Sequence, residues 1–101
     1  MLTNKERNFL RRIGNELSPI VIVGKGGIND NVVEQLDQAL TARELVKCRV
    51  LPHTDNDPRE VADTLAERTG AEVVLVVGNN MLLYRRPEPG KPSKLNWPAE
   101  D

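Results

Sequence analysis

Three stretches of the chain carry apolar residues three and four positions apart, which is the spacing that lines one face of a helix. Thr3 and Glu6 form a capping box ahead of the first stretch. Asp57-Pro58 gives the third stretch an N-cap followed by a proline at the first helical position. The predicted helices run from Asn4 to about Glu16, from Asn29 or Asp30 to about Ala42, and from Asp57 to Gly70.

Shorter apolar runs between these helices predict strands. Apolar and charged residues alternate along Leu45–Leu51, so Val46, Cys48 and Val50 should face a core while Lys47 and Arg49 face outward. Val73–Val77 is continuously apolar, which is typical of a strand covered on both faces. The predicted strands are Ile20–Val23, Leu45–Leu51, Val73–Val77 and Met81–Arg85, with a tight turn at Asn79-Asn80 joining the last two.

The resulting element order, α-β-α-β-α-β-β, predicts a single α/β domain over residues 1–86. Strands linked through a helix tend to run parallel, and a closing hairpin adds an antiparallel strand, so we expect a four-stranded mixed sheet with three helices. Prolines 87, 89, 92 and 98 prevent regular structure beyond Arg86, so residues 87–101 are expected to form a flexible tail.

Composition narrows the possible functions. The single cysteine, Cys48, excludes a disulfide framework and a cysteine-based zinc site. With only Phe9, Tyr84 and Trp97 as aromatic residues, an exposed platform for stacking bases is not expected. No run resembles a secretory signal or a membrane span, which predicts a cytoplasmic protein.

The net charge of −1 hides an uneven distribution of charge along the chain. Cations gather in residues 1–25 and 81–95, whereas acids concentrate in residues 55–72. This segregation predicts one basic and one acidic face. The lone histidine, His53, and the carboxylates of the third helix form neither a convincing metal site nor a catalytic set, so we expect no metal, cofactor or enzymatic activity.

The sequence Gly24-Lys25-Gly26-Gly27 lies between an apolar strand and a helix N-terminus, a setting that suits a phosphate group. It matches neither the Walker loop nor the Rossmann fingerprint. The G-x-x-G loop of KH domains is chemically closer, but that loop joins two helices. A purely structural turn after the strand is the alternative.

In sum the chain resembles the YhbY family of bacterial ribosome-associated proteins, whose fold is the CRM domain, over residues 1 to about 86. The match rests on the basic first helix, Pro19 before a strand, Gly24-Lys25-Gly26-Gly27-Ile28, the segment from Glu44 to Val50, Thr69-Gly70-Ala71, and Leu83-Tyr84-Arg85. The resemblance implies a fold similar to the C-terminal domain of bacterial translation initiation factor three. It also implies RNA binding, association with precursors of the large ribosomal subunit, and no catalysis.

These considerations predict a non-catalytic protein that docks on structured ribosomal RNA, with neither DNA nor a membrane as partner. The resemblance places RNA contacts at the glycine loop and, on the first helix, at Lys5, Arg7, Arg11 and Arg12. Lys47, Arg49 and Arg85 would extend the basic track. Each of these three also has a structural interpretation, as a solvated strand face or a sheet terminus. Trp97 is expected to dock on the domain, and stacking on a base is the alternative.

Two other functions stay open. The acidic face of the third helix would suit a protein-interaction adaptor that does not depend on Lys25. A binder of a small phosphate ligand would require a concave pocket at the glycine loop.

Overall fold

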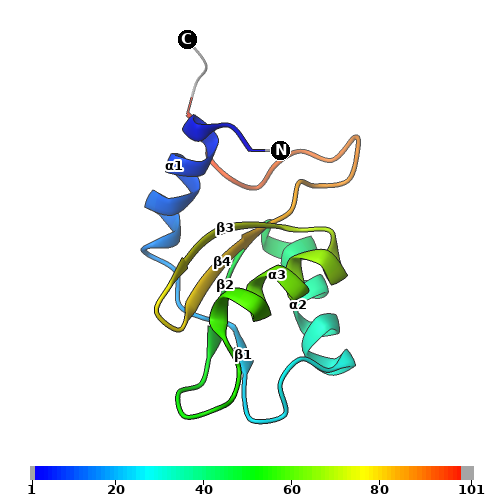
Figure 1. Cartoon of the computed structure of the whole chain (residues 1–101). Helices are drawn as coiled ribbons and strands as arrows, with labels where there is room; N and C mark the ends of the chain where they lie inside the picture. The colour runs from blue at the N-terminus through cyan, green and yellow to red at the C-terminus, as the bar shows by residue number, and fades with distance from the viewer. Residues whose placement is uncertain (1, 99–101) are drawn as a thin grey trace.

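Between residues 2 and 98, three helices and four strands follow one another in the predicted order. They are α1 (Asn4–Gly14), β1 (Val21–Val23), α2 (Asp30–Arg43), β2 (Leu45–Val50), α3 (Pro58–Thr69), β3 (Glu72–Val77) and β4 (Asn80–Tyr84). The computed structural model describes residues 2–98 and places the strands in the order β1-β2-β4-β3 (Figure 1). β1 pairs with β2 in parallel, and the β2–β4 and β3–β4 pairs are antiparallel, so the predicted mixed sheet is confirmed.

The local capping signals act as the sequence predicts. The Thr3 side chain accepts a hydrogen bond from the Glu6 N–H, and Glu6 accepts one from the Thr3 N–H. Asn29 caps α2 through Val32, and Asp57 caps α3 with Pro58 directly after it. Each cap satisfies N–H groups that the first helical turn leaves without a partner.

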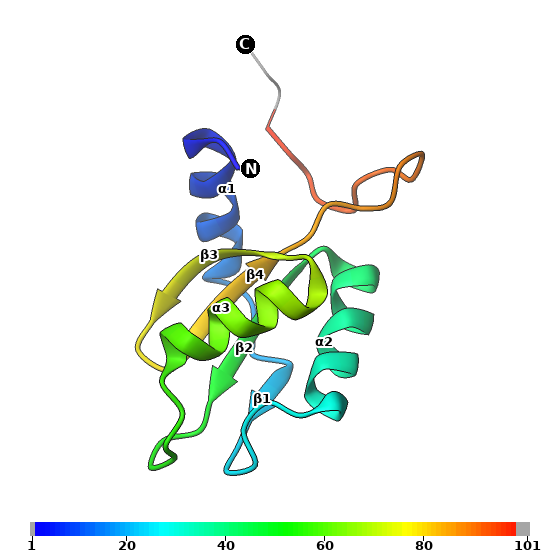
Figure 2. The same cartoon turned by 45° about the vertical axis from the view of Figure 1, so that its right-hand side comes forward.

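Helices α2 and α3 cover one face of the sheet (Figure 2). As predicted, Val46, Cys48 and Val50 point into this core and are fully buried. The opposite face carries α1, whose Phe9 and Leu10 pack with Leu45, Leu82, Tyr84 and neighbouring apolar residues. Because one helix cannot cover a four-stranded sheet, part of this face is left open.

The structure corrects three details. α1 ends at Gly14 rather than Glu16. The hairpin turn lies at Gly78-Asn79, one residue earlier than predicted, because Gly78 takes the positive φ of 56°. β3 is not covered on both faces along its length: it is an edge strand, and Val77 is 60% exposed beyond the reach of α1.

The segment after β4 has neither helix nor strand up to residue 98, as its prolines predict. It nevertheless contacts the domain. The Glu44 carboxylate accepts hydrogen bonds from the Ser93 hydroxyl and the Lys94 N–H, and Trp97 packs on Phe9 with ring centroids 4.8 Å apart. Docking of Trp97 on the domain is therefore confirmed, whereas flexibility of the tail stays a prediction. Within residues 2–98 no helix has the length and hydropathy to cross a bilayer.

Candidate nucleic-acid interface

The glycine loop, Gly24–Gly27, forms a tight turn that connects β1 to α2. The Gly27 N–H donates to the Gly24 carbonyl at 2.9 Å, and Gly27 has a φ of 67° that disfavours any side chain. Lys25 is exposed at the tip. The N–H groups of Lys25 and Gly26 donate to no oxygen among the described residues. The turn therefore offers a cation and backbone donors to an anion.

A second loop, which connects β2 to α3, supports the glycine loop. The Asn56 amide donates to the Gly24 carbonyl at 2.9 Å, and its oxygen would lie 3.3 Å from a Cβ at Gly27. This support was not predicted, because 32 residues separate Asn56 from Gly24 and nothing in the local sequence links them. It also brings Asp55 and Asp57 close to the loop, so basic and acidic surfaces are less separate than the charge pattern suggested.

The uncovered part of the sheet presents a second set of cations. Pairing places Ile22, Arg49, Asn80 and Val77 in one row across all four strands. Lys47 lies on the same face, two residues before Arg49, beside a hollow of about 170 Å³ that Asn15 of the α1 C-cap also lines. We call this surface the open face and define it by Ile22, Lys47, Arg49, Asn80 and Val77. It combines two outward cations, as predicted, with two exposed aliphatic side chains.

The predicted basic surface of α1 does not act as one unit. Arg7 points inward, and its Nη1 donates to the Val73 and Val74 carbonyls at 2.9 and 3.0 Å, where the β3 ladder is irregular. Arg12 lies over the Phe9 ring, and Lys5 sits at the far end of the helix near the tail. Arg11 is exposed, and it lies one turn before Asn15, which lines the hollow beside Lys47.

Arg85 makes a structural contact that holds two helices to the end of the sheet. Its Nη1 lies 2.6 Å from Asp37 Oδ1 and donates to the Thr69 carbonyl at 2.8 Å, while its Nη2 donates to the Thr41 hydroxyl. With its side chain only 22% exposed and its charge paired, Arg85 has little left to offer a phosphate. Of the two interpretations open for this residue, the structural one is favoured.

Shifted pKa values reflect packing and capping. Burial raises the pKa of the Cys48 thiol to about 12. Burial, and then the charge of Glu44, raise the pKa of Tyr84, which packs in the core. The Thr3 N–H holds the pKa of Glu6 below its usual value. These groups lie in the core or at the start of α1, apart from the glycine loop and the open face.

Comparison with known proteins adds an independent line of argument. The family model described as CRS1 / YhbY (CRM) domain matches residues 2–85. The chain is 41% identical to the "Probable RNA-binding protein YqeI" of Bacillus subtilis, covering 94% of this chain and 99% of the relative. It is 31% identical to the "Probable RNA-binding protein PA4753" of Pseudomonas aeruginosa, and the match covers 89% of this chain and 88% of the relative.

A plant relative and a solved structure extend the comparison. The chloroplastic group IIA intron splicing facilitator CRS1 of Zea mays is 29% identical, with 95% of this chain matching 14% of that protein. The solution structure of the hypothetical protein SAV1595 from Staphylococcus aureus superposes with a TM-score of 0.76 at 41% identity, covering 94% of this chain and 99% of that one. The predicted fold and the resemblance stated from sequence motifs are thereby confirmed.

Proposed function

Because the chain belongs to the CRS1/YhbY (CRM) domain family, we propose that it is a non-catalytic protein that binds structured RNA through the glycine loop and the open face. We propose further that this RNA is ribosomal RNA in a precursor of the large subunit, bound in the cytoplasm. The names of bacterial relatives support RNA as the ligand class. The assignment to ribosomal RNA rests on the family resemblance alone.

The observation that carries the proposal is the difference between paired and unpaired cations. Among the described residues, five arginines and two lysines form ion pairs or donate hydrogen bonds to protein oxygens: Arg7, Arg59, Arg68, Arg85, Arg86, Lys91 and Lys94. Apart from Arg43, the cations without such partners lie on α1, the glycine loop and the open face: Lys5, Arg11, Arg12, Lys25, Lys47 and Arg49. The net charge of −1 therefore understates the positive charge that these parts of the surface can offer to a phosphate.

The geometry favours contact with the RNA backbone. Lys25 and the free N–H groups of its turn would hold a phosphate, and Arg49 and Lys47 would hold neighbouring phosphates along the strand. Ile22 and Val77 would pack against sugar carbons at either edge of the sheet. Asp55 and Asp57 would repel phosphates on the α3 side of the loop, so the RNA would approach from the open face. Such contacts recognise shape more than base sequence.

Binding of deproteinised large-subunit ribosomal RNA across a salt series tests this proposal. Four contacts, from Arg11, Lys25, Lys47 and Arg49, should make affinity fall with roughly the 3.6th power of salt concentration, which is about 150-fold between 50 and 200 mM. Lys25→Glu should weaken binding by about tenfold or more, equivalent to about 1.4 kcal/mol. Lys91→Glu is the matched control, since it changes the charge equally in the tail.

Two results would contradict the proposal. If Lys25→Glu and Lys91→Glu bind equally well, the glycine loop is not a phosphate site. If the native chain does not bind this RNA at moderate salt, direct docking is wrong, and an adaptor that binds a protein partner becomes the better explanation.

A further inference from the structure

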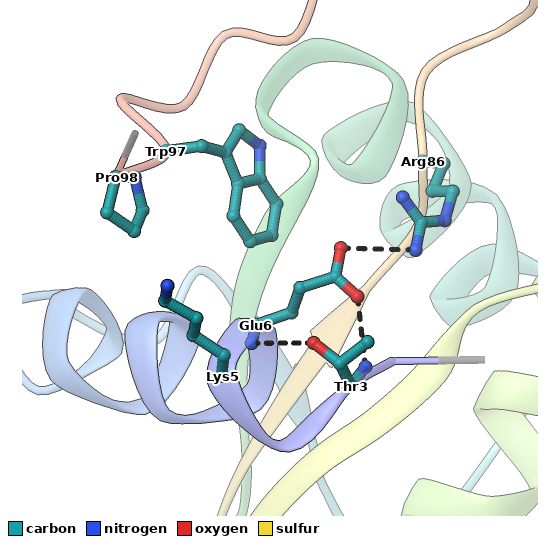
Figure 3. A pocket seen from close by; sticks show the side chains of 6 residues that line it. All are labelled: Thr3, Lys5, Glu6, Arg86, Trp97 and Pro98. Carbon is teal, nitrogen blue, oxygen red and sulfur yellow. Dashed lines mark hydrogen bonds and ion pairs between the residues drawn. The ribbon is translucent and has the colours of Figure 1, made fainter. Parts of the chain in front are cut away.

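A second concave site lies between the start of α1 and the tail (Figure 3). These two segments are at the end of the molecule opposite the glycine loop (Figure 1). Its volume is about 370 Å³. It is lined by Thr3, Lys5, Glu6, Arg86, Trp97 and Pro98. We call it the tail pocket. Its size falls within the usual range for small-ligand sites, and it combines one large aromatic ring with groups of both charges.

The aromatic wall of the tail pocket is held in place by a chain of contacts. The Trp97 indole N–H donates to the Ser93 hydroxyl at 2.9 Å, and that hydroxyl donates to Glu44 at 2.7 Å. Glu44 is only 2% exposed, so this anchor lies inside the fold. The Phe9 ring packs against the indole, with the two ring centroids 4.8 Å apart. The Tyr84 ring meets the indole edge-on, with an angle of 82° between the ring planes and the centroids 5.7 Å apart. The ring is therefore positioned before any ligand arrives.

The polar groups of the tail pocket carry a net positive charge. Arg86 pairs with Glu6 at 3.3 Å, while Lys5 is exposed and makes no ion pair or hydrogen bond within residues 2–98. Figure 3 shows the Trp97 indole and the Arg86 guanidinium on either side of the Glu6 carboxylate, with Lys5 and Pro98 on the indole side. An aromatic face flanked by an unpaired cation suits a ligand that has both a planar ring and an anionic group.

We propose that the tail pocket takes one unpaired nucleotide of a bound RNA, with its base stacked on Trp97 and its phosphates near Lys5 and Arg86. This inference rests on the proposed RNA-binding function and adds a single-stranded contact to backbone docking. The Glu6 carboxylate accepts hydrogen bonds, so it favours a base with an exocyclic amino group, which guanine, cytosine and adenine carry and uracil lacks.

Trp97 is the only tryptophan in the chain and so reports directly on the pocket. The experiment titrates the full chain with an unstructured octamer of cytidine and adenosine, and separately with an RNA duplex of equal charge, while following tryptophan fluorescence. Anisotropy of labelled RNA measures affinity independently. The octamer should quench the fluorescence to saturation, and the duplex should leave it nearly unchanged. An oligouridine of equal length should bind several-fold more weakly than the octamer.

Lys5→Glu tests the phosphate side of the pocket. It should weaken octamer binding on the order of tenfold, the usual scale for reversing a charge at a phosphate contact. The variant is not expected to unfold α1, because an acidic residue in the first turn of a helix is favourable. Lys91→Glu, outside the tail pocket, should leave octamer binding unchanged.

The possible failures are distinguishable. If the octamer binds without changing Trp97 fluorescence, or if Lys5→Glu matches Lys91→Glu, the tail pocket does not bind a nucleotide. In that case ribosomal RNA binding that still depends on Lys25 would leave the proposed function intact. If the octamer quenches Trp97 while Lys25→Glu has no effect on ribosomal RNA, the pocket is supported and the glycine-loop interface is overturned. If neither RNA binds, both proposals are wrong.

Discussion

Replacing Gly14 with alanine should destabilise the protein, although alanine is the better helix former. A Cβ at this position would lie 2.4 and 2.9 Å from the two methyl carbons of Leu82 and 3.2 Å from its Cγ. Leu82 is only 3% exposed between α1 and the sheet, so its side chain can turn away only toward the hollow that it lines beside Lys47. Overpacking of this kind costs about 1–3 kcal/mol, and the gain in helix propensity is at most about 1 kcal/mol. We expect a net loss of about 1–2 kcal/mol.

Urea unfolding followed by circular dichroism measures this loss as a fall in midpoint with an unchanged slope. A double-mutant cycle with Leu82→Ala identifies the cause, because removing the leucine side chain removes all three close atoms. In the Leu82→Ala background, Gly14→Ala should be neutral or stabilising, which gives a coupling energy of at least about 1 kcal/mol. If Gly14→Ala raises the stability of the native chain, helix propensity outweighs packing here and the close approach of α1 to β4 is not as described.

Three further predictions separate support of the fold from binding. Gly27→Ala should lower the free energy of unfolding by about 1–2 kcal/mol because Gly27 has a positive φ, whereas Gly26→Ala should lower it much less. If the two variants lower the melting temperature equally, the turn geometry described for this loop is wrong. Arg85→Ala should lower the free energy of unfolding by about 1–3 kcal/mol and leave the RNA affinity of the folded protein unchanged. If RNA affinity falls while stability does not, Arg85 contacts RNA after all. The Cys48 thiol, with a pKa raised to about 12, must stay neutral in the fold, so stability should be intact below pH 9 and fall as pH rises toward 12. Its alkylation at pH 8 should follow global unfolding, and rapid native-state alkylation would argue against its burial.

Much of the candidate interface could be predicted because it is contiguous in sequence. Gly24–Gly27 is one turn, and period-two alternation alone indicates that Lys47 and Arg49 share the outer face of a strand. The role of Asn56 could not be predicted, because its contact joins two loops that become neighbours only after β1 and β2 pair. Likewise, the aliphatic rim of the open face depends on which strands are at the edges.

The cations show most clearly which contacts could not be predicted from the sequence. On the sequence Arg7, Arg11, Lys25 and Arg85 are equivalent positive charges near basic neighbours. Packing separates them: Arg7 donates to carbonyls of β3, Arg85 pairs with Asp37, and Lys25 stays exposed. Their partners lie 66 and 48 residues away, so no local pattern could identify them.

The sequence by itself determined the element order, the helix caps and the glycine loop. All of these depend on groups within about four residues of each other, whose geometry follows from backbone conformation and side-chain chemistry. Only the tertiary structure decided the strand order, the exposed edge at Val77, which cations remain unpaired, and how the tail docks on Glu44. Those features depend on contacts between distant segments, and such contacts are selected by the burial of the whole core rather than by any single stretch of chain.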